Sequence, residues 1–349
     1  MGVIRVALNG FGRIGQRTAR MIWENPDCGL EIVAINELYD AAWIKRRIER
    51  DSVYGKFQGE VSIEQEGACL CVNGKYVYVY GERAIADLPW LKLKVDLVID
   101  ATGVFMTYDQ LEAHLLAGAK KVLLTAPTKD ERIPMIVNGV NSNLLLSAKE
   151  LNREYKIVSN ASCTTNCIAP LCWIIHKIFG IESGFARTIH AATPGQKVFD
   201  SMGSKKDPRR NRCTGRSIIP TSTGAAAAIG IVIPVLAGLI DGEADRVPLD
   251  TGSSVILDFD LVGMVEDKQE LNRLIQEEIR AFDFQDIVQF LEDEQYVSCD
   301  VTGENWAAVV SGDLTRVRCN GKKISLRLWY DNEMGYTHQL LEIAKIMCS

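Results

Sequence analysis

A glycine-rich turn between a short strand and a helix constrains the fold of this chain more than any other feature. Residues 3–9 are mostly apolar, and Gly-Phe-Gly-Arg-Ile-Gly follows at residues 10–15, before an apolar-periodic segment that runs through Trp23. The glycines of a G-x-G-x-x-G turn permit a tight bend, a close approach of the backbone to a pyrophosphate and close packing of helix on strand. The pattern predicts a dinucleotide-binding domain.

An acidic residue bears on the choice of dinucleotide. A second apolar strand, residues 30–36, ends in Glu37. A carboxylate at this place accepts hydrogen bonds from the ribose hydroxyls of an adenosine and repels a 2′-phosphate. A lone G-x-G-x-x-G often carries no meaning, but here the strand, the helix and the acid accompany it. The sequence therefore predicts NAD rather than NADP as the cofactor.

Further apolar segments continue this pattern. Residues 95–100, 121–124 and 157–158 are typical of buried parallel strands, and the first two run into small residues, as expected at a nucleotide crevice. Residues 60–80 alternate around an Asn-Gly turn, which indicates an antiparallel hairpin. The first half thus predicts an α/β fold, a Rossmann domain with five or six parallel strands.

A cysteine in the middle of the chain is the candidate for covalent chemistry. Residues 159–167 read Ser-Asn-Ala-Ser-Cys-Thr-Thr-Asn-Cys, and an apolar segment follows as far as Gly180. This predicts strand, tight turn and helix, with Cys163 in the first helical turn. Free amides and the helix dipole at such a position favour thiolate and lower a cysteine pKa. A buried structural cysteine is the alternative, and the local pattern favours neither.

The second half of the sequence has a different pattern of strands and helices. Its strands are longer, show polar alternation and are crossed by helices, which predicts an α+β catalytic domain with a mostly antiparallel sheet. The expected strands are residues 185–191, 253–262, 305–310 and 323–330, and the expected helices are residues 267–282 and 334–347.

His190 is the histidine best placed for catalysis. The chain has four histidines, and His190 closes a strand in a Thr/Ser-rich region, whereas His114 lies in a segment typical of a surface helix. For a single residue, a satisfied core histidine is the more common outcome. Beyond the long loop 193–217, Thr-Gly at the start of an alanine-rich helix at residues 223–224 is a candidate anion site.

Composition narrows the classes of function. The chain has 349 residues, enough for two domains, and its net charge of −6 predicts neither a nucleic-acid nor a membrane partner. We find no apolar stretch of membrane-spanning length and expect no signal peptide. The ten cysteines are scattered without metal-ligand spacing, so we expect reduced thiols, no metal site and a cytoplasmic location.

Taken together, these stretches resemble the phosphorylating glyceraldehyde-3-phosphate dehydrogenase family nearly end to end. The strings that carry the resemblance are residues 9–15, 51–55, 159–171, 189–191, 221–226, 246–248 and 330–333. The family implies a Rossmann domain over residues 1–162, onto which a C-terminal helix at 333–349 packs back. It implies a catalytic domain over residues 163–332.

The resemblance also implies a mechanism. Cys163 would attack the aldehyde carbon of glyceraldehyde 3-phosphate, giving a thiohemiacetal and then a thioester. His190 would hold the thiolate as an ion pair, take the hydroxyl proton during hydride transfer to NAD, and help to bind the oxyanion. Inorganic phosphate would release 1,3-bisphosphoglycerate. A homotetramer is expected, with the loop 193–217 reaching toward the neighbouring subunit's cofactor.

The implied ligand-binding residues form three groups. Those for the cofactor are Gly10, Phe11, Gly12, Arg13, Ile14, Gly15, Glu37, Arg83, Thr102, Gly103, Thr125, Asn332 and Tyr336. Among them, Asn332 would hold the nicotinamide carboxamide. Those for the attacking phosphate are Ser162, Thr164, Thr223 and Gly224. Thr193 and Arg246 would bind the phosphate of the substrate itself.

Some positions depart from the family pattern. Gly195 stands where a second threonine usually binds phosphate, Met334 replaces a tryptophan, and the loop after His190 is one residue longer. Glu37 stands where aspartate is commoner, and residues 36–42 look closer to erythrose-4-phosphate dehydrogenase, a sister branch that gives 4-phosphoerythronate. That activity is the alternative. Two further hypotheses assign the chain to other functional classes. One is a catalytically silent NAD-binding relative, and the other is a thiol acyltransferase without a redox step.

Overall fold

The structure is a computed structural model that describes residues 2–151, 154–205 and 207–349. The chain divides into two compact units. The first consists of Met1–Ile136, Ser142–Ala161 and Leu340–Ser349. The second consists of Val137–Asn141 and Ser162–Gln339.

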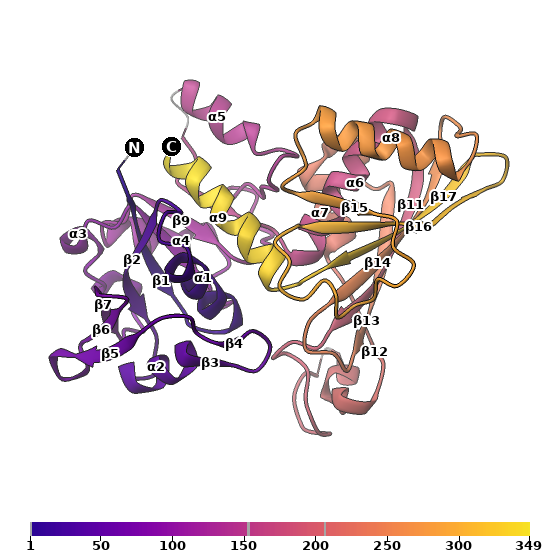
Figure 1. The fold of residues 1–349 in the computed structure, drawn as a ribbon. Coiled ribbons are helices and arrows are strands. Elements are labelled where there is room, and N and C mark those ends of the chain that lie inside the picture. Colours follow the sequence, from indigo (N-terminus) through magenta and orange to yellow (C-terminus); the bar gives the residue numbers. More distant parts are fainter. Residues whose placement is uncertain (1, 152–153, 206) are drawn as a thin grey trace. The chain divides into compact units, whose positions relative to one another are not determined.

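An eight-stranded sheet forms the centre of the first unit, in the order β10-β9-β8-β1-β2-β7-β6-β5 (Figure 1). Its strands are β1 (Ile4–Asn9), β2 (Leu30–Asn36), β5 (Val61–Glu64), β6 (Cys69–Val72), β7 (Lys75–Tyr80), β8 (Leu97–Asp100), β9 (Lys121–Leu124) and β10 (Ile157–Ser159). The six strands from β10 to β7 are parallel, and β6 pairs antiparallel with both β5 and β7. The predicted parallel sheet with a hairpin excursion is confirmed.

The order of this sheet reverses at β1. The chain leaves β1 for β2 on one side and returns later to β8 on the other side. The crevice at the carboxyl ends of the strands at such a switch point is where open α/β sheets bind ligands. The helices of this unit are α1 (Arg13–Glu24), α2 (Ala41–Glu49), α3 (Trp90–Leu93), α4 (Tyr108–Leu116) and α5 (Asn143–Glu150), and the short strands β3 (Arg50–Asp51) and β4 (Gly55–Lys56) pair with each other.

The main core of the first unit contains residues from both ends of the chain. Val6 and Leu8 of β1 lie in one buried cluster with Ile22 of α1. Leu340 and Ile343 belong to the same cluster. They are part of α9 (Met334–Cys348), whose residues up to Gln339 fall in the second unit and whose later residues fall in the first.

The second unit is built on a seven-stranded sheet in the order β12-β13-β11-β14-β17-β16-β15. Its strands are β11 (Ile181–Ala191), β12 (Ile219–Thr221), β13 (Ile240–Val247), β14 (Ser253–Leu261), β15 (Val288–Leu291), β16 (Ala308–Arg318) and β17 (Lys323–Tyr330). Four neighbouring pairs are antiparallel, and β11–β13 and β15–β16 are parallel. The prediction of a mostly antiparallel sheet is confirmed. The strand expected at residues 305–310 begins later, at Ala308, and continues to Arg318.

Three helices accompany this sheet: α6 (Cys163–Phe179), α7 (Ala225–Val232) and α8 (Lys268–Ala281). Helix α6 packs against α7 and α8 and contacts β14 and β17. Its apolar residues are buried almost along the whole helix, as its sequence predicts. The start of α6 is thereby held at the sheet.

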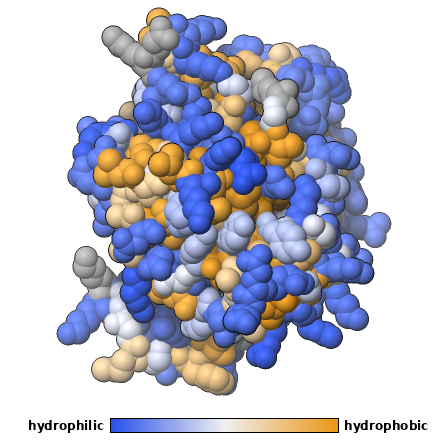
Figure 2. Space-filling view, turned by 90° about the vertical axis from the view of Figure 1, so that its left-hand side faces the viewer, coloured by the Kyte–Doolittle hydropathy of each residue, from blue (hydrophilic) through white to orange (hydrophobic). Residues whose placement is uncertain are grey.

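The surface is mixed in character. On the face drawn in Figure 2, hydrophilic side chains predominate and apolar ones form separate clusters. Within the described residues, no helix has both the length and the apolar character needed to cross a membrane.

Candidate active site

The glycine turn after β1 has the geometry that its sequence predicts. Gly10 has a φ of 91°, and a Cβ there would lie 2.9 Å from the backbone nitrogen of Thr102. A Cβ on Gly15 would lie 2.2 Å from the carbonyl oxygen of Gly10. A side chain at either position would collide with backbone, so both glycines are needed for the close packing of β1, α1 and β8.

A pocket of about 570 Å³ opens at the carboxyl ends of β1, β2 and β8. Its lining residues are Asn9, Gly10, Phe11, Gly12, Asn36, Glu37, Leu38, Glu82, Arg83, Ile85, Ala101, Thr102, Val104 and Phe105. Glu37 is fixed there, because its Oε2 accepts from the Phe11 amide at 2.8 Å and its Oε1 from the Leu38 amide at 2.8 Å. Six predicted cofactor residues thus share one pocket: Gly10, Phe11, Gly12, Glu37, Arg83 and Thr102.

The other predicted cofactor residues lie elsewhere. Arg13 forms an ion pair with Asp51, with 2.7 Å between Nη1 and Oδ2. Ile14 and Gly15 continue into α1, and neither Gly103 nor Thr125 is among the lining residues. Asn332 and Tyr336 belong to the second unit, and both are buried.

A buried polar network lies behind this pocket. The carboxylate of Asp100 accepts from Asn9 Nδ2 at 2.8 Å and from the Thr102 hydroxyl at 2.7 Å. Trp90 donates its indole N–H to Nδ1 of His114 at 3.0 Å. Because indole nitrogen only donates, Nδ1 accepts and the ring proton lies on Nε2, 3.3 Å from Asp100 Oδ2. The expectation of a surface helix around His114 is wrong for this side chain, which is fully buried.

The candidate nucleophile follows a tight turn. Ala161, a buried non-glycine residue, has a φ of 53° in the left-handed region, and α6 begins two residues later at Cys163. Ser162 caps the helix, and its hydroxyl oxygen accepts from the Thr165 amide at 3.0 Å. The predicted strand, turn and helix are therefore present, and Cys163 lies at the first turn.

A histidine faces the thiol. His190, near the end of β11, places Nε2 3.4 Å from the Sγ of Cys163. On the other side of the ring, Nδ1 lies 2.8 Å from the carbonyl oxygen of Ala191. A carbonyl only accepts, so Nδ1 carries the proton and Nε2 is free to accept one from sulfur. The ring of Tyr330 meets the imidazole edge-on at a centroid distance of 5.9 Å.

Burial dominates the protonation of this pair. It raises the pKa of the Cys163 thiol, against the opposing effects of the Arg246 charge and of hydrogen bonds from Thr164. Burial, followed by the Arg246 charge, lowers the pKa of His190 to about 3. The expected lowering of the thiol pKa is thus not found, and both shifts favour the neutral thiol and imidazole over an ion pair. Attack by sulfur then needs proton transfer to Nε2.

Arg246 is the positive group next to this pair. On β13 it stands beside His190 of β11 in the parallel register, and its Nη1 donates to Ala191 O at 3.1 Å. Its Nε is buried and finds no partner among the described residues. A buried guanidinium nitrogen in this state is suited to an anionic ligand.

The remaining predicted anion ligands differ in their surroundings. The Thr193 hydroxyl donates to Gln196 Oε1 at 2.8 Å, and the nearest atom to a Cβ on Gly195 would be Thr193 Oγ1 at 3.9 Å. Gly224 precedes α7, and Thr223 Oγ1 accepts from the Ala225 amide at 3.2 Å. The Thr164 hydroxyl lies 2.8 Å from that of Tyr330.

Several residues of the two sites were not predicted. Asn9 and Asn36 line the nucleotide pocket, and their position at the carboxyl ends of parallel strands was a usable signal. Ser253 and Thr251 contact Asn332, with 2.9 and 3.3 Å between their hydroxyl oxygens and Oδ1. Nothing in the local sequence distinguishes these two hydroxyls from other strand-end residues.

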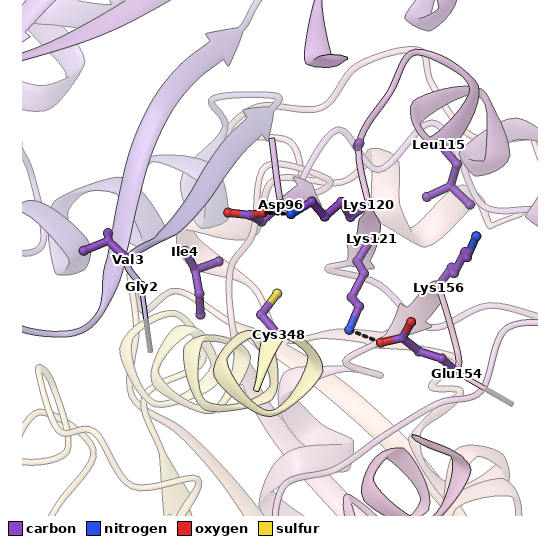
Figure 3. Close-up of a pocket in the computed structure, with 11 residues that line it drawn as sticks. Gly2, Val3, Ile4, Asp96, Leu115, Lys120, Lys121, Glu154, Lys156 and Cys348 are labelled. Carbon is purple, nitrogen blue, oxygen red and sulfur yellow. Dashed lines mark hydrogen bonds and ion pairs between the residues drawn. The ribbon is translucent and has the colours of Figure 1, made fainter. Parts of the chain in front are cut away.

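A cavity of about 660 Å³ opens at the opposite edge of the first sheet, at the start of β1, β8, β9 and β10 (Figure 3). Asp96 pairs with Lys120 at 2.7 Å, and Lys121 pairs with Glu154. Figure 3 shows the sulfur of Cys348 pointing into the opening, where burial raises its pKa to about 11. None of the predicted site residues lies here.

The ten cysteines are the residues that could form disulfides or contribute to a metal site. All ten cysteines are free, and Cys167, four residues after Cys163, is fully buried. Burial raises the pKa of the Cys167 thiol well above its usual value, followed in effect by Cys163. In the described parts of the chain, no three His, Cys, Asp or Glu side chains are grouped as metal ligands.

Comparison with known proteins agrees with this geometry. A family model described as glyceraldehyde 3-phosphate dehydrogenase, NAD binding domain, matches residues 4–108, and one described as the C-terminal domain matches residues 162–332. Glyceraldehyde-3-phosphate dehydrogenase of Clostridium acetobutylicum is 43% identical over 97% of this chain and 96% of its own. That of Borreliella burgdorferi is 40% identical over 98% and 99%, and that of Geobacillus stearothermophilus 39% identical over 99% and 98%. The chain therefore belongs to the glyceraldehyde-3-phosphate dehydrogenase family, with an NAD-binding domain followed by a catalytic domain.

Proposed function

We propose that this protein oxidises glyceraldehyde 3-phosphate with NAD and inorganic phosphate, giving 1,3-bisphosphoglycerate, as in glycolysis. The observation that carries the proposal is the contact of 3.4 Å between Cys163 Sγ and His190 Nε2 in a chain of this family. A silent NAD-binding relative has no need for this pair. An acyltransferase without a redox step has no need for a dinucleotide pocket.

The pair supports covalent catalysis. Cys163 bonds to the aldehyde carbon while its thiol proton passes to Nε2 of His190 and on to the new alkoxide. His190 then takes the hydroxyl proton of the thiohemiacetal as the hydride departs, which leaves a thioester on Cys163. A phosphate oxygen attacks this thioester, the carbon–sulfur bond breaks, and the thiol recovers its proton.

Arg246, Thr193, Thr223 and Gly224 support the binding of the two phosphates. The buried Nε of Arg246 and the hydroxyl of Thr193 suit the phosphate of the substrate. The amides at the start of α7 suit the attacking phosphate, with Ser162 and Thr164 at the start of α6. Gly195 offers no hydroxyl, so we expect weaker binding of the substrate phosphate than a threonine would give.

The residues of the first unit fit NAD. The pocket of about 570 Å³ has a glycine backbone open to a pyrophosphate, since a Cβ on Gly12 would meet nothing within 4 Å. Glu37 presents a carboxylate for ribose hydroxyls. When bound, NAD accepts the hydride from the substrate carbon. Asn332 of the second unit, with Oδ1 already accepting from the Ser253 hydroxyl, would offer Nδ2 to the carboxamide.

The decisive experiment follows NADH formation by absorbance. Glyceraldehyde 3-phosphate should be oxidised in a reaction that depends on added phosphate, and NADP should support a much lower rate. The specificity constant for erythrose 4-phosphate should be smaller. A larger constant for erythrose 4-phosphate, with no dependence on phosphate, would show that the sister activity is the true one.

We also propose a cytoplasmic homotetramer. Support comes from the loop 193–217, where Phe199 is 78% and Met202 97% exposed. Large apolar side chains presented in this way are typical of a contact surface between chains. The mass of the purified protein in solution, measured by light scattering, tests the assembly.

A further inference from the structure

We propose that Ser253 is a positioning residue that aligns the catalytic base and the nicotinamide-binding amide through one hydroxyl group. The inference rests on the roles proposed above for His190 and Asn332. Ser253 is the first residue of β14 and is completely buried. It touches neither substrate nor cofactor in this proposal, and it acts only through its two neighbours.

The hydroxyl of Ser253 has a fully specified set of partners. Its oxygen accepts from the Ala191 amide at 3.0 Å and donates to Asn332 Oδ1 at 2.9 Å. A hydroxyl has one proton, and this contact uses it. Toward His190 Nδ1, 3.4 Å away, Ser253 can therefore only accept.

This restriction reinforces the tautomer that the Ala191 carbonyl already favours. Nδ1 of His190 faces two acceptors, the Ala191 carbonyl at 2.8 Å and the Ser253 oxygen at 3.4 Å. The proton consequently stays on Nδ1, and the lone pair of Nε2 stays directed at Cys163. The role resembles that of the third member of a catalytic triad, but a backbone carbonyl and a neutral hydroxyl share it and leave the imidazole uncharged.

The same hydroxyl determines the orientation of the Asn332 amide. Oδ1 accepts from Ser253 at 2.9 Å, whereas Thr251 donates its one proton at 2.9 Å to Asp331, so an amide turned over would present its N–H group to the Ser253 hydroxyl proton. Nδ2 is left to donate to a carboxamide oxygen. One buried serine thus keeps the proton acceptor and the cofactor donor in register, as positioned catalysis requires.

The test uses Ser253→Ala, with Ser253→Cys as a second variant of similar size. The matched control is Ser254→Ala, because Ser254 is the next residue of β14, is equally buried and accepts from Arg327 instead. We expect Ser253→Ala to weaken NAD binding to the substrate-free enzyme by about three- to tenfold, the effect of one lost hydrogen bond. Ser254→Ala should leave NAD affinity within about twofold of wild type.

Two further measurements separate positioning from general loosening. In an Asn332→Ala background, Ser253→Ala should change NAD affinity by less than about twofold, because the side chain through which Ser253 affects the cofactor has been removed. The rate of Cys163 alkylation by iodoacetamide, followed against pH without cofactor, should fall for Ser253→Ala at pH 7. Fully additive effects on NAD affinity, or an unchanged alkylation profile, would overturn the proposal. These readouts need no turnover, so they stand even if the aldehyde has been misassigned.

Discussion

At the residue scale, two cysteines four positions apart have opposite prospects. Cys163 is partly exposed at the start of α6 and contacts an imidazole, whereas Cys167 is fully buried one helical turn later. Because the pKa of both thiols is raised, the position at the helix terminus does not by itself identify the nucleophile. Cys163 differs from Cys167 in that its side chain is accessible and contacts a proton acceptor.

Cys163→Ser should abolish dehydrogenase activity while NAD affinity stays within about threefold of wild type, because a hydroxyl is a far weaker nucleophile. NADH formation and cofactor titration measure the two effects. Cys299→Ser, at an exposed cysteine, is the control and should keep full activity. If the Cys163 variant retained a tenth of the activity, the nucleophile would have to be another residue.

The lowered pKa of His190 makes the free energy of unfolding depend on pH. Its pKa of about 3 in the folded protein is lower than the usual value of about 6.5, so between these pH values the unfolded chain binds the extra proton. The stabilisation that comes from a neutral His190 in the folded protein is complete above about pH 6.5 and is lost as the pH falls toward 3. We expect the free energy of unfolding to lose about 1 kcal/mol from this group between pH 6 and pH 5. Urea titrations of wild type and His190→Asn at one protein concentration measure it. An equal pH slope in both proteins would contradict the assignment.

Gly195 offers a gain-of-function test. A Cβ there would make only an ordinary contact, 3.9 Å from Thr193 Oγ1, so a threonine fits, and its hydroxyl would add a donor for the substrate phosphate. We expect Gly195→Thr to lower the Michaelis constant for glyceraldehyde 3-phosphate by about two- to tenfold without changing that for unphosphorylated glyceraldehyde. Gly195→Val, which has the same shape but no hydroxyl, is the control. A similar gain from valine would show that packing, not hydrogen bonding, is responsible.

At the scale of elements, the local motifs predicted more than the long-range pairings. The β1–α1 and β10–α6 turns were predicted because a short local string specifies each of them, glycine-rich in the first case and small and polar in the second. The parallel pairing of β11 with β13 was not predicted, because alternation along a strand does not reveal its partner or direction. Strand β15 is as short as β8 and β9, but charged residues rather than small ones follow it, so nothing in the sequence marked it as a strand.

In the candidate active site, too, residues in local motifs were predicted, whereas residues that act through long-range contacts were not. Cys163, His190 and Arg246 were predicted by their strings, and the structure places them in one cluster. Ser253 was not, because its value depends on what two distant segments bring to it. His114 was misread because its helix has polar neighbours, while the partners of its ring lie on β8 and α3.

The hydrogen bond between Trp90 of α3 and His114 of α4 should contribute measurably to the free energy of unfolding. Trp90→Phe keeps most of the ring but removes the N–H that His114 Nδ1 accepts, which leaves a buried acceptor without a partner. We expect a loss of about 1–3 kcal/mol in the free energy of unfolding, measured with urea. Trp306→Phe, which removes a more exposed bond to Gln285, should lose about 1 kcal/mol or less. Equal losses in the two variants would show that the buried network adds nothing.

At the scale of the whole molecule, the proposed assembly depends on the loop 193–217. Phe199→Asp should weaken association through the loop 193–217, because it places a charge on a surface that we expect to be buried between chains. Light scattering across a dilution series should show a lower mass than wild type. Met264→Asp, at a similarly exposed apolar residue outside this loop, should keep the wild-type mass. Unchanged mass in both variants would remove the loop from the interface.

The division of α9 between the two units has a consequence for the order in which the protein matures on the ribosome. Val6 and Leu8 pack in one core with Leu340 and Ile343, which are translated much later. The nucleotide unit therefore cannot complete its core until the second half of α9 has been synthesised, although most of its strands emerge first. The residues of the second unit up to Gln339 all precede that segment, so the core of the first unit is completed after the chain of the second has been made. A chain that stops before Leu340 lacks part of the core to which Val6 and Leu8 belong.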